Sequence, residues 1–189
     1  MSVNETFQKR NTNRDLKQSW EELRQIADMC AEANVDLVGY TSMAFGNPYR
    51  EPHDLDRVVE FAGRLKEMGA ATIQLADTVG LASPEQVAVT FHAVRAAVGD
   101  MPLGVHLHAG PGMMRQIVTA ALDAGCRLFD SAIGGIGGCP FAGAELVGNV
   151  DTIALLELLE ELGYRVDYSA ADLAAAAATA ADVRRDYGS

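Results

Sequence analysis

Hydrophobic residues recur at three- and four-residue steps along several segments of the chain, and short apolar runs separate these segments. The spacing is typical of amphipathic helices. The first such segment has one apolar face made of Leu16, Trp20, Leu23, Ala27 and Cys30. Asn13 is a suitable N-terminal cap for this helix. A strand is predicted next, at residues 35–42, followed by a loop rich in glycine, asparagine and proline.

The same alternation continues to the end of the chain. Ser83 followed by Pro84 is a capping residue with a first-turn proline, and Gly69 and Gly125 are suitable helix stops. A last helix is predicted to begin at Ser169, which has capping-box spacing to Asp172. The remaining predicted strands are residues 72–77, 103–108 and 128–133, and the remaining predicted helices are residues 54–69, 83–98, 113–124 and 149–162.

Four strands that alternate with helices indicate βα units and a parallel sheet, so the fold class is α/β. The residues with chemical potential lie at strand ends or just after them, namely Asp77, His106, His108 and Cys139. In a (β/α)8 barrel this edge is the catalytic face. A complete barrel needs eight strands, and this chain offers four. We therefore predict a partial (β/α)8 barrel that occupies residues 1–189 as one domain.

Composition narrows the class of protein. The chain has 189 residues, of which 49% are hydrophobic and 22% charged, as in globular domains. A formal net charge of −11 argues against a nucleic-acid partner. No apolar run reaches the roughly 20 residues of a membrane span, and the amino terminus carries no signal core, so we expect a cytoplasmic protein without membrane contact. The three cysteines form no CxxC pair.

Two histidines, His106 and His108, alternate with apolar residues in a predicted strand. Residues two apart in a strand face the same side, so both imidazoles are expected to face one way. Two imidazoles at one level suit a divalent metal. The alternative is a pair of histidines that only satisfy hydrogen bonds near a sheet edge.

The segment from Gly134 to Cys139 has four glycines in its first five residues. Such a loop exposes backbone N–H groups, and a cysteine within it is a candidate acid, base or nucleophile. The alternative is a flexible linker with an incidental thiol. Cys30 and Cys126 are interpreted as small core hydrophobes.

Several polar residues carry two interpretations each. Asn149 is either a helix cap or an oxygen ligand for a hard metal. Asp77 either orients a substrate or closes a turn, and Asp130 and Ser131 have the same placement and the same ambiguity. His53 and His92 are interpreted as a loop residue and a helix-surface residue without a chemical role.

Together these motifs resemble the hydroxymethylglutaryl-CoA lyases. The specific match is SAIGGIGGCPF at residues 131–141, which is similar to their cysteine loop. VHLH at residues 105–108 resembles their metal-binding strand, which other metal-dependent aldolases and synthases share. Asp77-Thr78-Val79-Gly80 resembles their DTxG turn, and Gly39-Tyr40 with residues 46–49 resembles their fifth strand. The resemblance covers nearly the whole chain and identifies it as the carboxyl-terminal half, strands five to eight, of such a barrel.

The resemblance implies a function and a set of roles. The metal would be Mg²⁺ or Mn²⁺, held by His106, His108 and Asn149. Cys139 would take part in proton transfer, Asp77 would help organise the substrate, and Thr78, Gly137 and Gly138 would contact it. The reaction would be a retro-Claisen cleavage of a 3-hydroxy-3-methylglutaryl-CoA-like substrate to acetyl-CoA and acetoacetate.

The resemblance also implies a partner. The family's arginine and metal-binding aspartate lie on an early strand of the other half of the barrel. We therefore expect either a complementing N-terminal half-barrel chain or a homo-oligomer. Two alternatives stay open: an aldolase or acyltransferase-type synthase of the same superfamily, and a non-catalytic truncated fragment. Where the family continues the histidine strand with aspartate, this chain has Ala109.

Overall fold

The structure is a computed structural model that describes residues 1–138 and 147–187. Its strands form one four-stranded parallel sheet in the order β1-β2-β3-β4. The strands are β1 (Val38–Ser42), β2 (Thr72–Ala76), β3 (Leu103–His106) and β4 (Phe129–Asp130). The helices are α1 (Glu5–Thr12), α2 (Leu16–Ala33), α3 (Leu55–Glu67), α4 (Pro84–Val98), α5 (Pro111–Asp123), α6 (Thr152–Glu161) and α7 (Ala170–Tyr187), with a 3₁₀ turn, η1 (Ile133–Gly135).

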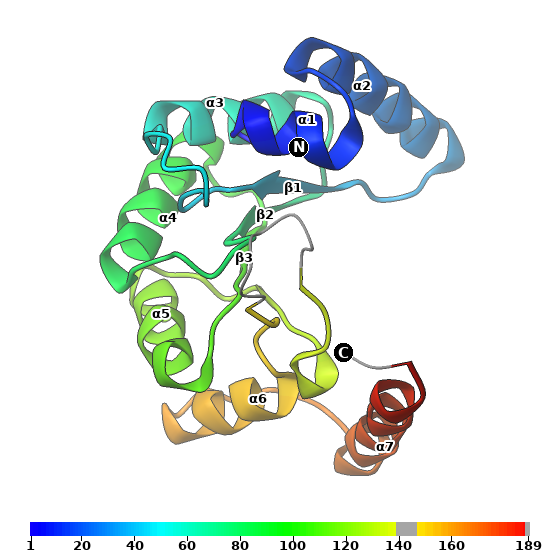
Figure 1. Cartoon of the computed structure of the whole chain (residues 1–189), viewed down its shortest axis with the longest axis vertical. Coiled ribbons are helices and arrows are strands. Elements are labelled where there is room, and N and C mark those ends of the chain that lie inside the picture. Colours follow the sequence, from blue (N-terminus) through cyan, green and yellow to red (C-terminus); the bar gives the residue numbers. More distant parts are fainter. Residues whose placement is uncertain (139–146, 188–189) are drawn as a thin grey trace.

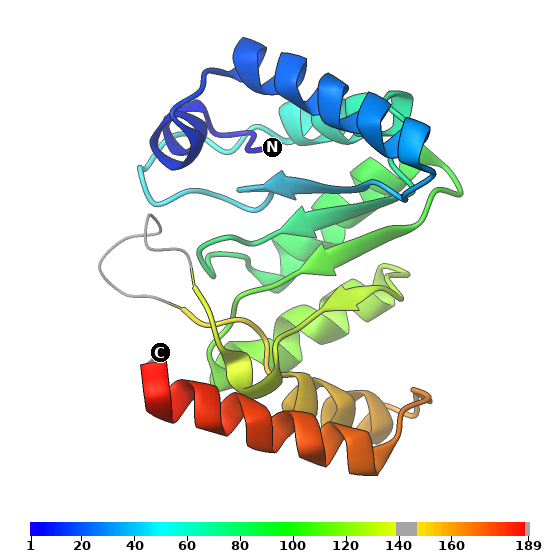
Figure 2. The same cartoon turned by 90° about the vertical axis from the view of Figure 1, so that its right-hand side faces the viewer.

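Helices α3, α4 and α5 cover one side of the sheet and its other side is uncovered, while α1 and α2 lie beyond β1 and α6 and α7 lie at the opposite end (Figure 1). Every strand points the same way, so the carboxyl ends of the strands gather at one edge (Figure 2). The core fills the space between sheet and helices. Its most completely buried side chains include Leu65, Ile73, Leu75, Phe91, Leu103 and Ile117. On the uncovered side, Val38, Tyr40 and Leu128 are 46%, 38% and 40% exposed.

Local capping explains most helix starts. The Ser83 hydroxyl accepts a hydrogen bond from the N–H of Gln86, and the Gln86 side-chain oxygen accepts one from the N–H of Ser83, at the start that the Ser-Pro signature predicts. Asp54 caps α3 with a single hydrogen bond, which its side chain accepts from the N–H of Arg57. The predicted cap of α2 is wrong: Asp15 forms the capping box with Gln18. Asn13 instead ends α1 in a left-handed conformation with φ of 55°.

The pattern of hydrophobic positions did not reveal α1. This helix has eight residues and buries only Phe7 and Gln8, so it carries too few apolar positions to show a period. Its start is set by Asn4, whose side-chain oxygen accepts a hydrogen bond of 2.8 Å from the N–H of Phe7. Before it, the backbone of residues 1–3 pairs with Ser42 at the end of β1.

The strands are shorter than predicted. Strand β3 ends at His106 instead of residue 108, and β4 contains only Phe129 and Asp130. The apolar runs that flank them continue into loops whose backbone groups bond elsewhere. The N–H of Val150, for example, donates to the Leu107 carbonyl. None of the described helices is both long and apolar enough to cross a membrane.

Gly104 lets β3 pass close to its neighbours. A Cβ atom at this position would lie 2.3 Å from the side-chain oxygen of Gln74 and 2.6 Å from the Leu128 carbonyl oxygen. We expect Gly104→Ala to lower the free energy of unfolding by about 1–3 kcal/mol, the usual cost of overfilling a packed site. Urea unfolding followed by circular dichroism measures this loss. Gly63→Ala is the control, because nothing lies within 4 Å of a Cβ placed there, and equal stabilities of the two variants would contradict the packing argument.

Candidate metal and substrate site

The two histidines meet at the carboxyl edge of the sheet. His106 is the last residue of β3, and His108 follows two residues later. Their Nε2 atoms lie 3.2 Å apart, and their ring centroids are separated by 5.2 Å. His108 is 5% exposed, and the side chain of His106 is 27% exposed. The rings thus lie together, as the two-residue spacing predicts, and one of them is buried.

The hydrogen bonds of His108 define its tautomer. Its Nδ1 lies 2.9 Å from the carbonyl oxygen of Val147. A carbonyl oxygen only accepts, so Nδ1 carries the proton and donates it. In the neutral ring Nε2 then has a free lone pair, and this lone pair points toward His106.

His106 meets a different neighbour. Its Nδ1 lies 3.5 Å from Oδ2 of Asp130 and, although buried, has no hydrogen-bond partner within residues 1–138 and 147–187. Burial, with the nearby His108, lowers the pKa of His106, which favours the neutral ring.

A neutral His106 ring can carry its proton on either of its two nitrogens. A proton on Nε2 would be donated to His108 but would leave the Nδ1 lone pair facing a carboxylate. A proton on Nδ1 faces that carboxylate favourably and leaves two Nε2 lone pairs directed at a common position. A divalent cation satisfies the second arrangement, so the pair fits a metal.

Asn149 supplies a third donor atom. It forms an isolated antiparallel bridge with His108, and its Nδ2 donates a 2.8 Å hydrogen bond to the Ile136 carbonyl. Its Oδ1 is buried and has no hydrogen-bond partner in the described part of the chain, which suits an oxygen ligand for Mg²⁺ or Mn²⁺. The interpretation of Asn149 as a helix cap is wrong, because Asp151 caps α6 through the N–H of Ile153.

The glycine-rich segment approaches this asparagine closely. Gly137 has a φ of 105°, and a Cβ atom there would lie 2.8 Å from Nδ2 of Asn149. A side chain at position 137 would therefore displace the amide. Cys139, the predicted acid or base, lies outside the described residues, and Gly138 is the last described residue before it. The proposed substrate contacts of Gly137 and Gly138 stay predictions.

Asp77 closes the turn after β2. It is 1% exposed, and its two carboxylate oxygens accept hydrogen bonds of 3.0 Å from the N–H groups of Leu81 and Ala82. Burial raises the pKa of Asp77, and these hydrogen bonds oppose the rise. The turn-closing role is thus present, and a role toward substrate stays a prediction.

Thr78 also binds backbone, since its hydroxyl accepts a hydrogen bond of 3.0 Å from the N–H of Met43. It ties the loop after β1 to the loop after β2. Whether Thr78 also contacts substrate stays a prediction.

Asp130 is the centre of a hydrogen-bond network that the sequence pattern did not reveal. Oδ2 of this residue accepts a 2.5 Å hydrogen bond from the Tyr40 hydroxyl, and Oδ1 accepts one of 3.3 Å from Nε2 of Gln74. Burial, with the Asp130 carboxylate, raises the pKa of Tyr40 to about 12. The sequence pattern gave no signal for this network, because it depends on the strand register, which places Tyr40 beside Gln74 and His106 beside Asp130.

The remaining candidates lie elsewhere. Cys126 is fully buried and donates to the Leu128 carbonyl, and burial raises its pKa to about 11, so it is a core residue. His53 binds the Ala44 carbonyl from its loop, and His92 is exposed on α4. Ser131 contacts the Thr152 hydroxyl.

Within residues 1–138 and 147–187, no three histidine, cysteine, aspartate or glutamate side chains form a metal-binding group.

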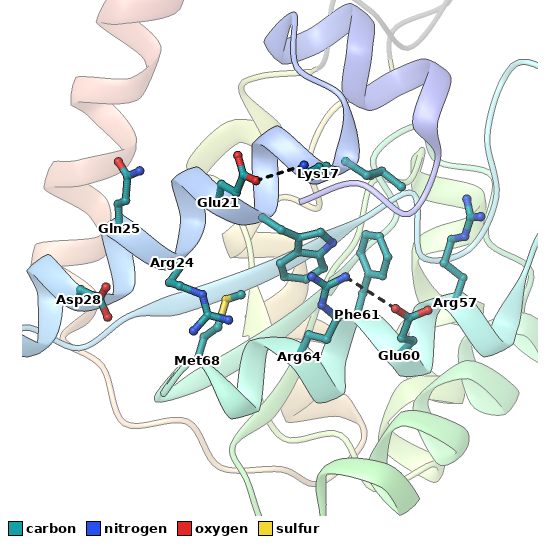
Figure 3. Close-up of a pocket in the computed structure, with 12 residues that line it drawn as sticks. Lys17, Glu21, Arg24, Gln25, Asp28, Arg57, Glu60, Phe61, Arg64 and Met68 are labelled. Atoms are coloured by element: carbon teal, nitrogen blue, oxygen red, sulfur yellow. Dashed lines mark ion pairs between the residues drawn. The ribbon is translucent and has the colours of Figure 1, made fainter.

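A groove of about 730 Å³ lies away from the histidine pair. It lies between α2 and α3, where Arg24, Phe61 and Arg64 face the space between the helices (Figure 3). Arg64 lies 3.8 Å above the ring of Trp20, which packs edge-on against Phe61. None of the predicted site residues that the structure describes lines this groove.

Comparison with known proteins decides the family. The family model described as HMGL-like matches residues 1–180. The chain belongs to the HMGL-like family. Among curated HMGL-like relatives, the hydroxymethylglutaryl-CoA lyase of Pseudomonas mevalonii is 36% identical over 164 residues, which is 86% of this chain and 54% of the relative.

Solved structures agree with this family. The HMG-CoA lyase of Brucella melitensis superposes with a TM-score of 0.89 at 31% identity and covers 98% of this chain and 65% of its own. An HMG-CoA lyase from Acinetobacter baumannii was solved in complex with coenzyme A and 3-methylmalate. It superposes with a TM-score of 0.88 at 28% identity, and the match covers 100% of this chain and 62% of the lyase. The predicted lyase family and partial-barrel fold are confirmed. The HMGL-like chain spans only 54% to 65% of the length of these three proteins.

Proposed function

We propose that this chain carries the metal-binding half of a hydroxymethylglutaryl-CoA lyase-type site. The substrate would be 3-hydroxy-3-methylglutaryl-CoA or a close analogue, and the products acetyl-CoA and acetoacetate. The observation that carries the proposal is the convergence of two Nε2 atoms, 3.2 Å apart, at the carboxyl edge of a parallel sheet. Membership of a family whose relatives are named lyases supports the choice of reaction. The complex of one neighbour with coenzyme A supports an acyl-CoA substrate.

His106, His108 and Asn149 would hold Mg²⁺ or Mn²⁺. When bound, the cation would supply Lewis-acid polarisation of the substrate hydroxyl and a neighbouring oxygen. Loss of the hydroxyl proton would let its oxygen form a carbonyl while the adjacent carbon–carbon bond breaks. The electron pair of that bond would leave on the enolate of acetyl-CoA, which a nearby acid protonates. By resemblance, Cys139 is proposed to take part in this proton transfer.

The proposal includes a second half of the barrel. Tyr40, Val38 and Leu128 are exposed on the side of the sheet that faces the interior of a closed barrel. The edges beyond β1 and β4 also offer strand pairing. A complementing half-barrel, from a separate chain or a second copy, would cover this face and enclose the substrate. A cytoplasmic location is part of the same proposal.

The test is an assay of the chain purified under native conditions together with whatever binds it. We expect Mn²⁺-dependent cleavage of hydroxymethylglutaryl-CoA to equal amounts of acetyl-CoA and acetoacetate, lost on addition of EDTA. The parallel assay offers acetyl-CoA and a 2-oxo acid for condensation. Condensation without cleavage would replace the lyase with a synthase. A preparation that binds Mn²⁺ but turns over neither substrate would mark the chain as non-catalytic.

A further inference from the structure

We infer that Asp130 is a positioning residue that selects the tautomer of His106, so that both imidazoles offer Nε2 to one cation. The inference rests on the proposed metal site and concerns how the chain prepares it. Asp130 would not bind the metal itself. Its effect would pass through the His106 ring.

The sheet places the carboxylate beside the ring. Asp130 on β4 is the register partner of His106 on β3. Oδ2 lies 3.5 Å from Nδ1 of His106, slightly beyond the usual range of an N–H···O bond. Among the residues that the structure describes, no acceptor lies within hydrogen-bond distance of this buried nitrogen. Asp130 is thus the negative group placed to attract a proton on Nδ1.

The carboxylate is itself held from two further strands. Tyr40 on β1 donates to Oδ2, and Gln74 on β2 donates to Oδ1. The Tyr40 ring also lies edge-on to the His106 ring, with 5.8 Å between their centroids. Residues from all four strands therefore converge on one carboxylate–imidazole pair. A surface aspartate without a positioning role needs no such support.

Different groups face Nδ1 of the two histidines, but both favour the same tautomer, with the proton on Nδ1. The Val147 carbonyl accepts the Nδ1 proton of His108 at 2.9 Å, and Asp130 faces Nδ1 of His106. A carboxylate or carbonyl behind a metal-binding imidazole sets its tautomer and raises its basicity. Only the acceptor of His106 is a side chain, so only this half of the arrangement can be changed by substitution.

The experiment reads the tautomer first, without metal. The ¹⁵N-labelled chain is studied by long-range ¹H–¹⁵N NMR at a pH high enough for its histidines to be neutral. The spectrum reports which ring nitrogen of His106 carries the proton. We expect Nδ1–H in the wild type and a shift toward Nε2–H in Asp130→Asn. The amide removes the negative charge while keeping the size of the side chain. Asp123→Asn, an exposed aspartate at the end of α5, is the matched control.

The second measurement is Mn²⁺ affinity by electron paramagnetic resonance. Loss of an outer-shell partner costs roughly 10- to 100-fold in metal affinity, so we expect a loss in that range for Asp130→Asn and none for Asp123→Asn. Asp130→Glu keeps the negative charge, so this variant should keep part of the Mn²⁺ affinity that Asp130→Asn loses. A merely structural role would not shift the tautomer.

The outcomes separate the two proposals. A wild-type His106 with its proton on Nε2 would overturn the role of Asp130, even if Asp130→Asn failed to fold. So would a variant that keeps both the wild-type tautomer and the wild-type affinity. A shift of tautomer in a chain whose wild type does not bind Mn²⁺ would support Asp130 and overturn the metal site.

Discussion

Replacement of His108 by alanine is expected to reduce Mn²⁺ binding by roughly 100-fold or more. Loss of an outer partner alone costs about 10- to 100-fold, so loss of a ligand should reach at least the upper limit. His108 is the more buried of the two imidazoles, and its tautomer is set by a backbone carbonyl. Calorimetric titration of the chain with Mn²⁺ measures the effect.

The matched control for this result is His92→Ala. His92 is exposed on α4, so the variant loses one imidazole without touching the candidate site. Its Mn²⁺ affinity should equal that of the wild type. Unchanged affinity in His108→Ala would remove the metal assignment, and equal losses in both variants would indicate binding to surface histidines.

Asp77→Ala is expected to lower the free energy of unfolding by about 2–4 kcal/mol. The substitution removes the acceptor for two backbone N–H groups, and an unsatisfied buried donor costs roughly 1–3 kcal/mol. Both donors, on Leu81 and Ala82, lie in the turn that leads into α4. Guanidinium unfolding followed by circular dichroism measures the change.

Asp77→Asn separates the turn from any role toward substrate. The amide keeps one acceptor oxygen, so this variant should lose about half as much stability as Asp77→Ala. Asp100→Ala, at an exposed position, controls for the loss of charge. A fully stable Asp77→Ala would show that the turn does not depend on this carboxylate.

The amino-acid sequence by itself determined the four βα units and the starts of α3, α4 and α7. These features are local: an apolar face repeats every three to four residues, and a cap such as Ser83 bonds within one turn. The same locality made the shared direction of His106 and His108 predictable, because side chains alternate along a strand. The glycines near Asn149 were also visible as a pattern, although their reason was not.

Only the tertiary structure decided where β3 ends and what surrounds the two imidazoles. Asp130 and Tyr40, which hydrogen-bond, are 90 positions apart, and His108 and Val147 are 39 positions apart. No local pattern encodes such pairs, because they arise from the register of neighbouring strands and the path of a loop. For the same reason Asn149 was open to interpretation as a cap until its bridge to His108 placed its unpartnered oxygen inside the protein.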